Sequence, residues 1–201
     1  MRTLLLVLAL LGPIEQLDRD VAGAVQHARR PALEGPMRFA SQIGQPVVVI
    51  GGLVVVALLE GTLGAGTARV ALVALAGANL TTEALKRLTF RARPDGSHKR
   101  SNASFPSGHA TSAAALAWAL GRRWRKAAPF LGLFALWVCY SRMYLNRHWL
   151  SDVVVGVAIG ILWAWLAWRW LPPQAKRERP GEEPPLAAAE PQPAPPDRVA
   201  G

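Results

Sequence analysis

The chain alternates between long apolar runs and short polar segments. Six stretches are dominated by apolar residues, and they lie at 4–11, 46–59, 63–82, 109–120, 127–141 and 149–171. The last is long enough to cross a bilayer as a helix, since a span needs about 20 residues. The shorter runs can cross only with flanking residues or within a bundle. The pattern predicts an all-α, six-helix transmembrane bundle; the alternative is a soluble domain with six core helices.

Two segments depart from this pattern. Residues 14–45 mix charged and apolar positions and contain Pro31 and Pro36, so we expect one or two amphipathic helices lying at the membrane surface. From residue 172 the chain is polar and rich in proline, and it has too little apolar surface to order itself, which predicts a disordered tail. The chain therefore divides into an N-terminal segment (1–45), a membrane domain (46–171) and a tail (172–201).

The first apolar run has two interpretations. It follows a single positive charge, as expected of either a retained first membrane helix or a signal peptide. Residues 22–24 resemble a signal cleavage site, although the charged residues just before them are a poor approach to one. Both interpretations carry the following segment across the membrane.

The polar connections gather at the two faces of the predicted bundle. If every apolar run crosses, then 14–45, 86–108 and 142–148 share one face. The number of basic residues does not decide which face is cytoplasmic, because 12 lie on this face and 11 on the other. The opposite face, however, carries compact basic stretches at 121–126 and 176–179 that resemble cytoplasmic segments. We therefore expect a multi-pass protein of the plasma (inner) membrane whose first face is extracytoplasmic.

The net charge of the chain limits the kinds of molecule that it is expected to bind. The formal net charge is +10, which indicates an anionic partner such as a nucleic acid, a phosphate compound or an acidic lipid surface. No nucleic-acid-binding motif is present, and the basic residues flank the apolar runs, so phosphate or lipid is favoured. The single cysteine, Cys139, excludes an intrachain disulfide and leaves the redox compartment open.

Three cations, Lys86, Arg93 and Arg142, fall on the predicted extracytoplasmic face. Arginine presents a planar fork that suits phosphate oxygens, and lysine adds a compact point charge. Glu83 lies one helical turn before Lys86 and is a possible partner for it. The other basic residues nearby are expected to be ordinary basic residues of a membrane surface: Arg87, Arg91, Lys99 and Arg100.

The same face carries residues suited to nucleophilic catalysis. His148 and Asp152 are four apart and share one face of a helix, so the carboxylate can accept the Nδ1–H of the imidazole and leave Nε2 free. Such a pair on its own is more often structural. A second histidine, His109, changes this interpretation, because two histidines can divide the roles of nucleophile and general acid.

His109 closes the stretch "PSGH", which precedes a run of alanine, serine and threonine. Ser107 is suited to cap a helix, and Gly108 permits a close approach of the backbone. The start of a helix offers free N–H groups to an anion. The small residues that follow predict a helix packed tightly inside a bundle.

Taken together, these stretches resemble a known family. K-x6-R-P from Lys86, P-S-G-H from Pro106 and S-R-x5-H-x3-D from Ser141 follow in order and without a substitution. This is similar to the tripartite signature of the type 2 phosphatidic acid phosphatase (PAP2) superfamily, and the resemblance covers roughly residues 40–170. The gap between the first two motifs is short for the family, which implies a compact loop.

The resemblance implies a role for each motif residue. His148 would attack phosphorus and form a phosphohistidine, while Asp152 holds it and stabilises its positive charge. His109 would protonate the leaving oxygen and then activate the water that releases phosphate. The phosphoryl oxygens would be bound by the remaining motif residues: Lys86, Arg93, Arg142 and the amides of Ser107 and Gly108.

We accordingly expect hydrolysis of a lipid phosphate without a metal or other cofactor, because fixed cations would do the work of Mg²⁺ and no carboxylate cluster accompanies the motifs. The family implies substrates such as phosphatidic acid, phosphatidylglycerophosphate or undecaprenyl diphosphate, with the bilayer as the other partner. Three alternatives stay open: a phosphotransferase, a vanadium-dependent peroxidase, or a lipid-binding or transport protein without catalysis. The oligomeric state stays open as well.

Overall fold

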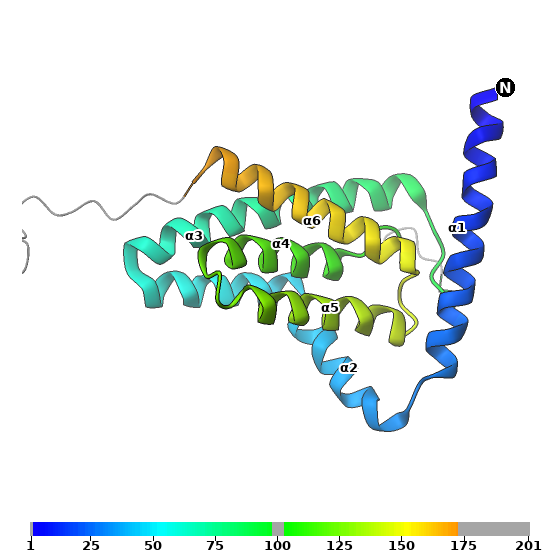
Figure 1. Cartoon of the computed structure of the whole chain (residues 1–201), viewed down its shortest axis with the longest axis horizontal. Helices are drawn as coiled ribbons and strands as arrows, with labels where there is room; N and C mark the ends of the chain where they lie inside the picture. Colours follow the sequence, from blue (N-terminus) through cyan, green and yellow to red (C-terminus); the bar gives the residue numbers. More distant parts are fainter. Residues whose placement is uncertain (1, 98–102, 173–201) are drawn as a thin grey trace, which may run out of the picture.

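The computed structural model describes residues 2–97 and 103–172, and every regular element in these ranges is an α-helix, as predicted. The helices are α1 (Arg2–His27), α2 (Pro31–Ile43), α3 (Pro46–Thr89), α4 (Gly108–Arg123), α5 (Ala128–Tyr144) and α6 (Leu150–Trp170) (Figure 1). The predicted disordered tail after Pro172 lies outside the described residues, as do Lys99 and Arg100.

Helix α3 differs from the predicted arrangement of six separate helices, because it contains two of the predicted apolar runs. The predicted runs at 46–59 and 63–82 belong to one continuous helical element, which folds back on itself (Figure 1). Its two arms pack together, because Leu53 of the first arm shares a core cluster with Val70 and Leu75 of the second. The sequence has three glycines within 60–66, and glycine permits the departure from a straight helix that this reversal requires.

The N-terminal segment forms two helices at one end of the bundle. Helix α1 continues without a break from the first apolar run through residues 22–24, and it stands apart from the other helices for much of its length (Figure 1). Its C-terminal end is docked on α5, because the Gln26 side chain donates hydrogen bonds to the carbonyls of Met143 (3.1 Å) and Tyr144 (3.2 Å). Helix α2 buries Met37 and Ala40 and leaves most of its other residues exposed, as an amphipathic helix does.

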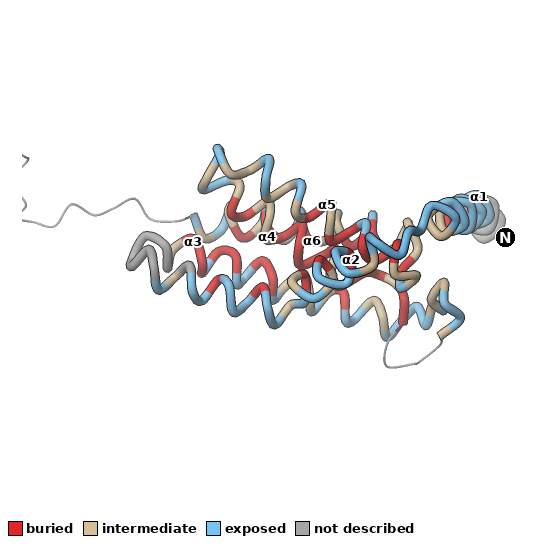
Figure 2. Tube along the Cα trace, turned by 90° about the horizontal axis from the view of Figure 1, so that it is seen from below, coloured by how far each residue is buried: buried red, intermediate tan, exposed pale blue. Residues whose placement is uncertain are grey.

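Helix α4 lies at the centre of the bundle and contacts α3, α5 and α6. Its predicted tight packing is confirmed, since most of its alanine, serine and threonine residues are buried (Figure 2). Gly156 and Gly160 of α6 make this approach possible. A Cβ atom on Gly156 would lie 2.7 Å from the Ser107 carbonyl oxygen, and one on Gly160 would lie 2.3 Å from that of Thr111. The close contact holds the N-terminal ends of α4 and α6 side by side.

In the described part of the chain, fewer helices are long and apolar enough to cross a membrane than the six apolar runs suggested. Within the described residues, α6 alone is long and apolar enough to cross a membrane by itself. Helix α2 and the first ten residues of α3 pass the same test as a pair broken by a 65° bend. Helices α4 and α5, with 16 and 17 residues, are shorter than the roughly 20 that a complete span needs.

Candidate active site

His148 lies in the connection between α5 and α6, where it is only 3% exposed. Its Nδ1 is 2.8 Å from the backbone carbonyl oxygen of Ser104. A carbonyl oxygen can only accept a hydrogen bond, so Nδ1 carries the proton and Nε2 keeps a free lone pair. The imidazole is thereby held as a neutral base or nucleophile with a defined reactive atom.

Asp152 is fully buried in the first turn of α6 and pairs with His148, with its Oδ2 3.6 Å from His148 Nδ1. The Ser104 carbonyl oxygen lies nearer to Nδ1, which the sequence did not predict. Oδ2 also accepts hydrogen bonds from the Ser104 hydroxyl and from the Trp149 amide (2.9 Å). Ser104 therefore connects the two, with its carbonyl on the histidine and its hydroxyl on the carboxylate.

Arg91 was expected to be an ordinary surface residue, and this is wrong. Its guanidinium donates to Asp152 at 2.7 Å and to Asp18 at 2.6 Å, and it lies 5.6 Å from the centre of the Trp149 ring. Two nearly buried carboxylates on different helices account for its position.

Arg87, in contrast, is an ordinary surface residue as expected. It is exposed and forms an ion pair with Glu83 at 3.2 Å. Glu83 also interacts electrostatically with Lys86, so its carboxylate lies near both basic residues.

Asp18 is a site residue that sequence reasoning missed. It belongs to α1 and is 2% exposed, and it accepts hydrogen bonds from the Ser151 amide (2.8 Å) and hydroxyl (2.6 Å) as well as from Arg91. We call the connected ion pairs the Asp18–Arg91–Asp152 bridge. Nothing local in the sequence distinguishes Asp18 from exposed Asp20, because only the docking of α1 against α6 buries one of them.

The predicted cations do come together. Lys86 and Arg93 are half-buried, and Arg142 is buried in the last turn of α5. Lys86 interacts electrostatically with both arginines and with Asp152. Like charges at such range repel each other strongly in a partly desolvated site, so an anion that binds among them is stabilised by all three.

Two buried polar groups of the motifs also lack an internal partner. Within the described residues, three buried side-chain atoms have no hydrogen bond, and two of these are Ser107 Oγ and Arg142 Nε. The Arg142 guanidinium also donates a short hydrogen bond to the Ser41 hydroxyl of α2. A buried donor without a partner costs roughly 1–3 kcal/mol, so a bound oxyanion would stabilise both groups.

The start of α4 departs from prediction in one detail. Ser107 occupies the N-cap position, but its side chain forms no capping hydrogen bond. Its amide donates to the Asp152 carbonyl oxygen (3.0 Å), so the expectation that this amide binds phosphate is wrong, and its hydroxyl is the available donor. Gly108 and His109 are the first two residues of α4, where backbone N–H groups have no partner within the helix. His109 interacts electrostatically with His148 and the nearby cations.

The carboxylates near the site are committed to protein groups. Asp152 and Asp18 are held by Arg91 and by serine or backbone donors. In the described part of the chain, no group of three or more His, Cys, Asp or Glu side chains is arranged to hold a metal ion.

Comparison with known proteins agrees with this geometry. Residues 67–176 match the model of the PAP2 superfamily. The decaprenylphosphoryl-5-phosphoribose phosphatase of Mycobacterium tuberculosis is 36% identical over 148 residues, which cover 68% of this chain and 81% of that protein.

Two crystal structures share the fold. The structure of Aquifex aeolicus LpxE has a TM-score of 0.67 and 22% identity, and the alignment covers 75% of this chain and 93% of that one. The PAP2-type phosphatidylglycerolphosphate phosphatase of Bacillus subtilis has a TM-score of 0.63 and 24% identity, over 79% of this chain and 86% of that one.

All three motifs, from Lys86 to Asp152, fall inside the region that the family model matches. The histidines and cations of these motifs also occupy one end of the helical bundle. Family match, relatives and geometry agree, and the chain therefore belongs to the PAP2 superfamily and is a lipid phosphate phosphatase.

Proposed function

We propose that the chain hydrolyses a lipid phosphate through a phosphohistidine on His148, without a metal ion. The observation that supports this most directly is the hydrogen bond from His148 Nδ1 to the Ser104 carbonyl oxygen, because it leaves Nε2 as a free nucleophile in a buried site. The cations around it supply positive charge where negative charge develops in the transition state.

In the first step, Nε2 bonds to phosphorus while the bond from phosphorus to the lipid oxygen breaks. The phosphoryl oxygens lie among the three motif cations, with the Ser107 hydroxyl and the Gly108 amide as further donors. The imidazole ring becomes positive, and Asp152 stabilises that charge from 3.6 Å without taking the proton.

His109 acts in both steps. It first gives a proton to the departing lipid oxygen, so the product leaves as a neutral alcohol, or as a monophosphate if the substrate is a diphosphate. It then takes a proton from water as that water attacks the phosphohistidine, which breaks the N–P bond and releases inorganic phosphate. This division needs both rings at one end of the bundle, and the electrostatic interaction between them supports that arrangement.

The relatives suggest which lipids to test. One acts on a decaprenyl-linked phosphoribose and another on phosphatidylglycerolphosphate, so a phosphomonoester on a headgroup is the proposed class. The purified protein in nanodiscs should be given these two lipids, phosphatidic acid and undecaprenyl diphosphate, with released phosphate and lipid product both measured. Consumption of lipid without phosphate release would identify a phosphotransferase instead, and no reaction with any of the four would contradict the proposal.

We further propose a multi-pass arrangement in the plasma (inner) membrane with the active site on the extracytoplasmic side. Apolar residues such as Val154, Leu162 and Trp165 are exposed along α6, as expected of a helix facing lipid. His109 and the basic stretch at 121–126 lie at opposite ends of α4, which separates the catalytic end from the end typical of the cytoplasm.

Labelling tests this topology. Single cysteines that replace Ser97 and Lys126, in a Cys139→Ser background, should react from opposite sides with a membrane-impermeant thiol reagent. Intact cells should label only the cysteine at 97, and disrupted cells should label both. Labelling of the cysteine at 126 alone would reverse the orientation, and equal labelling in intact cells would contradict the multi-pass arrangement.

Removal of metal ions tests the mechanism. Phosphate release should continue at an unchanged rate in excess EDTA, because the arginines and lysine already neutralise the phosphoryl oxygens. Vanadate should inhibit, since it adopts the five-coordinate geometry of the transition state. Loss of activity with EDTA, followed by recovery on addition of Mg²⁺, would show that a metal takes part in the reaction.

A further inference from the structure

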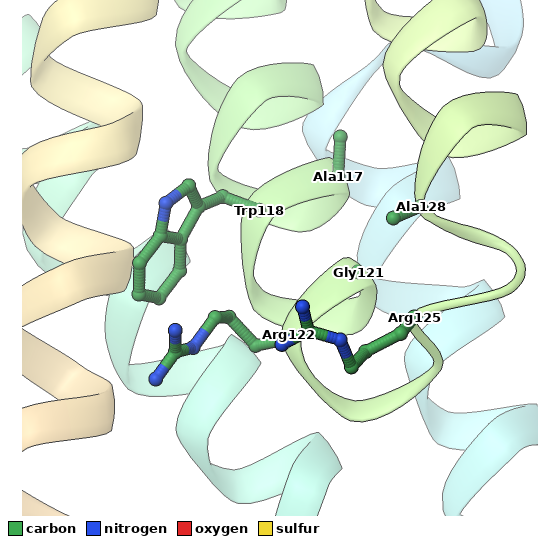
Figure 3. A pocket seen from close by; sticks show the side chains of 6 residues that line it. All are labelled: Ala117, Trp118, Gly121, Arg122, Arg125 and Ala128. Atoms are coloured by element: carbon green, nitrogen blue, oxygen red, sulfur yellow. The ribbon is translucent and has the colours of Figure 1, made fainter.

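A second basic site lies at the end of α4 remote from the catalytic residues. Gly121 follows His109 by 12 positions, which corresponds to about 18 Å along the helix. A pocket of about 290 Å³ is present at this end, and it is lined by Ala117, Trp118, Gly121, Arg122, Arg125 and Ala128 (Figure 3).

Two arginines define the chemistry of the pocket. The Arg122 guanidinium lies 5.5 Å from the centre of the Trp118 ring and 5.9 Å from that of Trp168, so cation–π contacts hold it at one side. Arg125 extends from the α4–α5 connection back toward Gly121 (Figure 3). A Cβ on Gly121 would lie 3.2 Å from that of Ala128, so glycine lets the two helix ends meet beneath the arginines.

These two arginines carry charge that the protein does not neutralise. Every ion pair found in the described part of the chain involves other residues, and neither Arg122 nor Arg125 donates a side-chain hydrogen bond there. Arg91 and Arg147 show the contrast, since each pairs with an aspartate. The pocket therefore presents two positive charges to a ligand.

An apolar groove continues from the pocket. It has a volume of about 320 Å³ and shares Ala117, Trp118 and Ala128 with the pocket. It then runs between α4, α5 and α6 toward Cys139, and the remaining lining side chains carry no charge. From Gly121 back to Ala114 the two spaces extend over about 10 Å of α4. Leu136 of α5, one of the lining residues, is itself exposed.

We propose that the pocket and groove bind an anionic phospholipid of the bilayer at the face opposite the active site. Its phosphate lies between Arg122 and Arg125, and one acyl chain occupies the groove. A pair of cations beside an apolar slot matches a phosphodiester joined to a hydrocarbon chain, and basic pockets between membrane helices are suited to such headgroups. The lipid is a bound partner and not a substrate, so this site does not depend on the catalytic steps proposed above.

Native mass spectrometry of the detergent-solubilised protein tests the site, with phosphatidylglycerol and phosphatidylcholine as the two probes. The wild-type protein should retain phosphatidylglycerol in preference to phosphatidylcholine. Arg122→Gln with Arg125→Gln should weaken phosphatidylglycerol binding at least tenfold. Arg123→Gln is the matched control, because Arg123 is exposed on the same helix but does not line the pocket, and it should bind as the wild type does.

A separate variant tests the groove. A Cβ on Gly132 would meet no atom within 4 Å, so Gly132→Phe can fill the groove without displacing the backbone, and it should also weaken phosphatidylglycerol binding at least tenfold. Undiminished hydrolysis of a lipid phosphate in detergent serves as the check that each variant is folded. Arg125→Gln alone, at an exposed position without an internal partner, should already reduce binding.

Three results would overturn the proposal. Unchanged binding in the double arginine variant would exclude the pocket as the headgroup site. Equal retention of the two lipids by the wild type would mean that only the apolar groove is used. Displacement of phosphatidylglycerol by a non-hydrolysable lipid phosphonate would assign the groove to the substrate chain.

Discussion

His148→Ala abolishes turnover of every substrate, whereas His109→Ala is severe only for substrates with poor leaving groups. A nucleophile is needed whatever departs, so the first variant should hydrolyse neither a lipid phosphate nor an activated aryl phosphate. A lipid alkoxide leaves badly without a proton, but an activated phenolate leaves unaided. General acid catalysis is typically worth about 10²–10⁴-fold, so the two substrates should separate clearly for His109→Ala.

Rapid-quench measurement of the phosphoenzyme distinguishes the two steps. With the aryl phosphate, His109→Ala should form the phosphohistidine in a burst and then release phosphate slowly, because the same ring also activates water. His27→Ala is the matched control, since His27 is exposed and belongs to no motif. If His109→Ala slows formation of the phosphoenzyme equally for both leaving groups, His109 is a phosphate-binding donor and not the general acid.

Arg91→Gln lowers kcat/KM by about 10- to 100-fold, an effect comparable to that of removing outer partners of catalytic histidines in metal sites. Arg91 touches no substrate in the proposed mechanism and acts as a positioning residue. It orients Asp152, whose Oδ2 also receives the Ser104 hydroxyl, and Ser104 in turn holds His148. Arg87→Gln is the matched control, because Arg87 lies in the same motif segment but is exposed and paired with Glu83.

The bridge can be tested from its other end. Asp18→Asn removes one carboxylate from Arg91 and should reduce kcat/KM in the same direction, whereas Asp20→Asn, at an exposed position of the same helix, should not. Arg91→Lys keeps the charge but lacks the planar fork that reaches two carboxylates, so it should restore only part of the activity.

A pH profile separates positioning from mere stability. Burial is the largest influence on the pKa of His148 and lowers it, Asp152 raises it, and Arg142 lowers it. The nucleophile must be unprotonated, so activity falls as the pH drops through this pKa. Removal of Arg91 leaves the negative charge of Asp152 less compensated, which favours protonated His148. The acid limb of kcat/KM should therefore move to higher pH in Arg91→Gln relative to the wild type.

The substrate phosphate titrates equally in both proteins, so the difference between the profiles reports the enzyme. If Arg91→Gln reduces only the yield of folded protein, and the folded fraction keeps the kcat/KM and acid limb of the wild type, the bridge is structural and has no part in positioning His148.

The sequence was sufficient to predict the features that follow from composition and from the order of apolar and polar segments. The helical class follows from the length and recurrence of the apolar runs, and the tight packing of α4 follows from its small residues. The first two motifs share one polar connection, and two successive apolar runs, 109–120 and 127–141, bring the third motif back to the same end of the bundle. These are properties of composition and order, which need no knowledge of how distant segments dock.

The remaining features depend on how helices distant in the sequence pack against one another, and these the sequence did not predict. Arg91 and Arg87 are indistinguishable as basic residues of one motif segment, and only the approach of α1 and α6 places two buried carboxylates around one of them. Likewise, His148 has a carboxylate one turn away, but the Ser104 carbonyl lies nearer to Nδ1. Two successive crossings at 46–59 and 63–82 already imply a reversal between them, but the pattern suggested a loop there, whereas helical hydrogen bonding continues through α3.

The Asp18–Arg91–Asp152 bridge also limits how far the chain can be shortened at its N-terminus. The family match begins at residue 67, whereas Asp18 and Ser41 hold Arg91 and Arg142 from α1 and α2, and the first arm of α3 supplies part of the core. A fragment trimmed to the matched region would keep every motif residue and still lose the groups that orient two of its arginines. The region that the family model matches is therefore narrower than the set of residues that hold the site, and we expect any minimal version or chimaera to need the N-terminal helices as well.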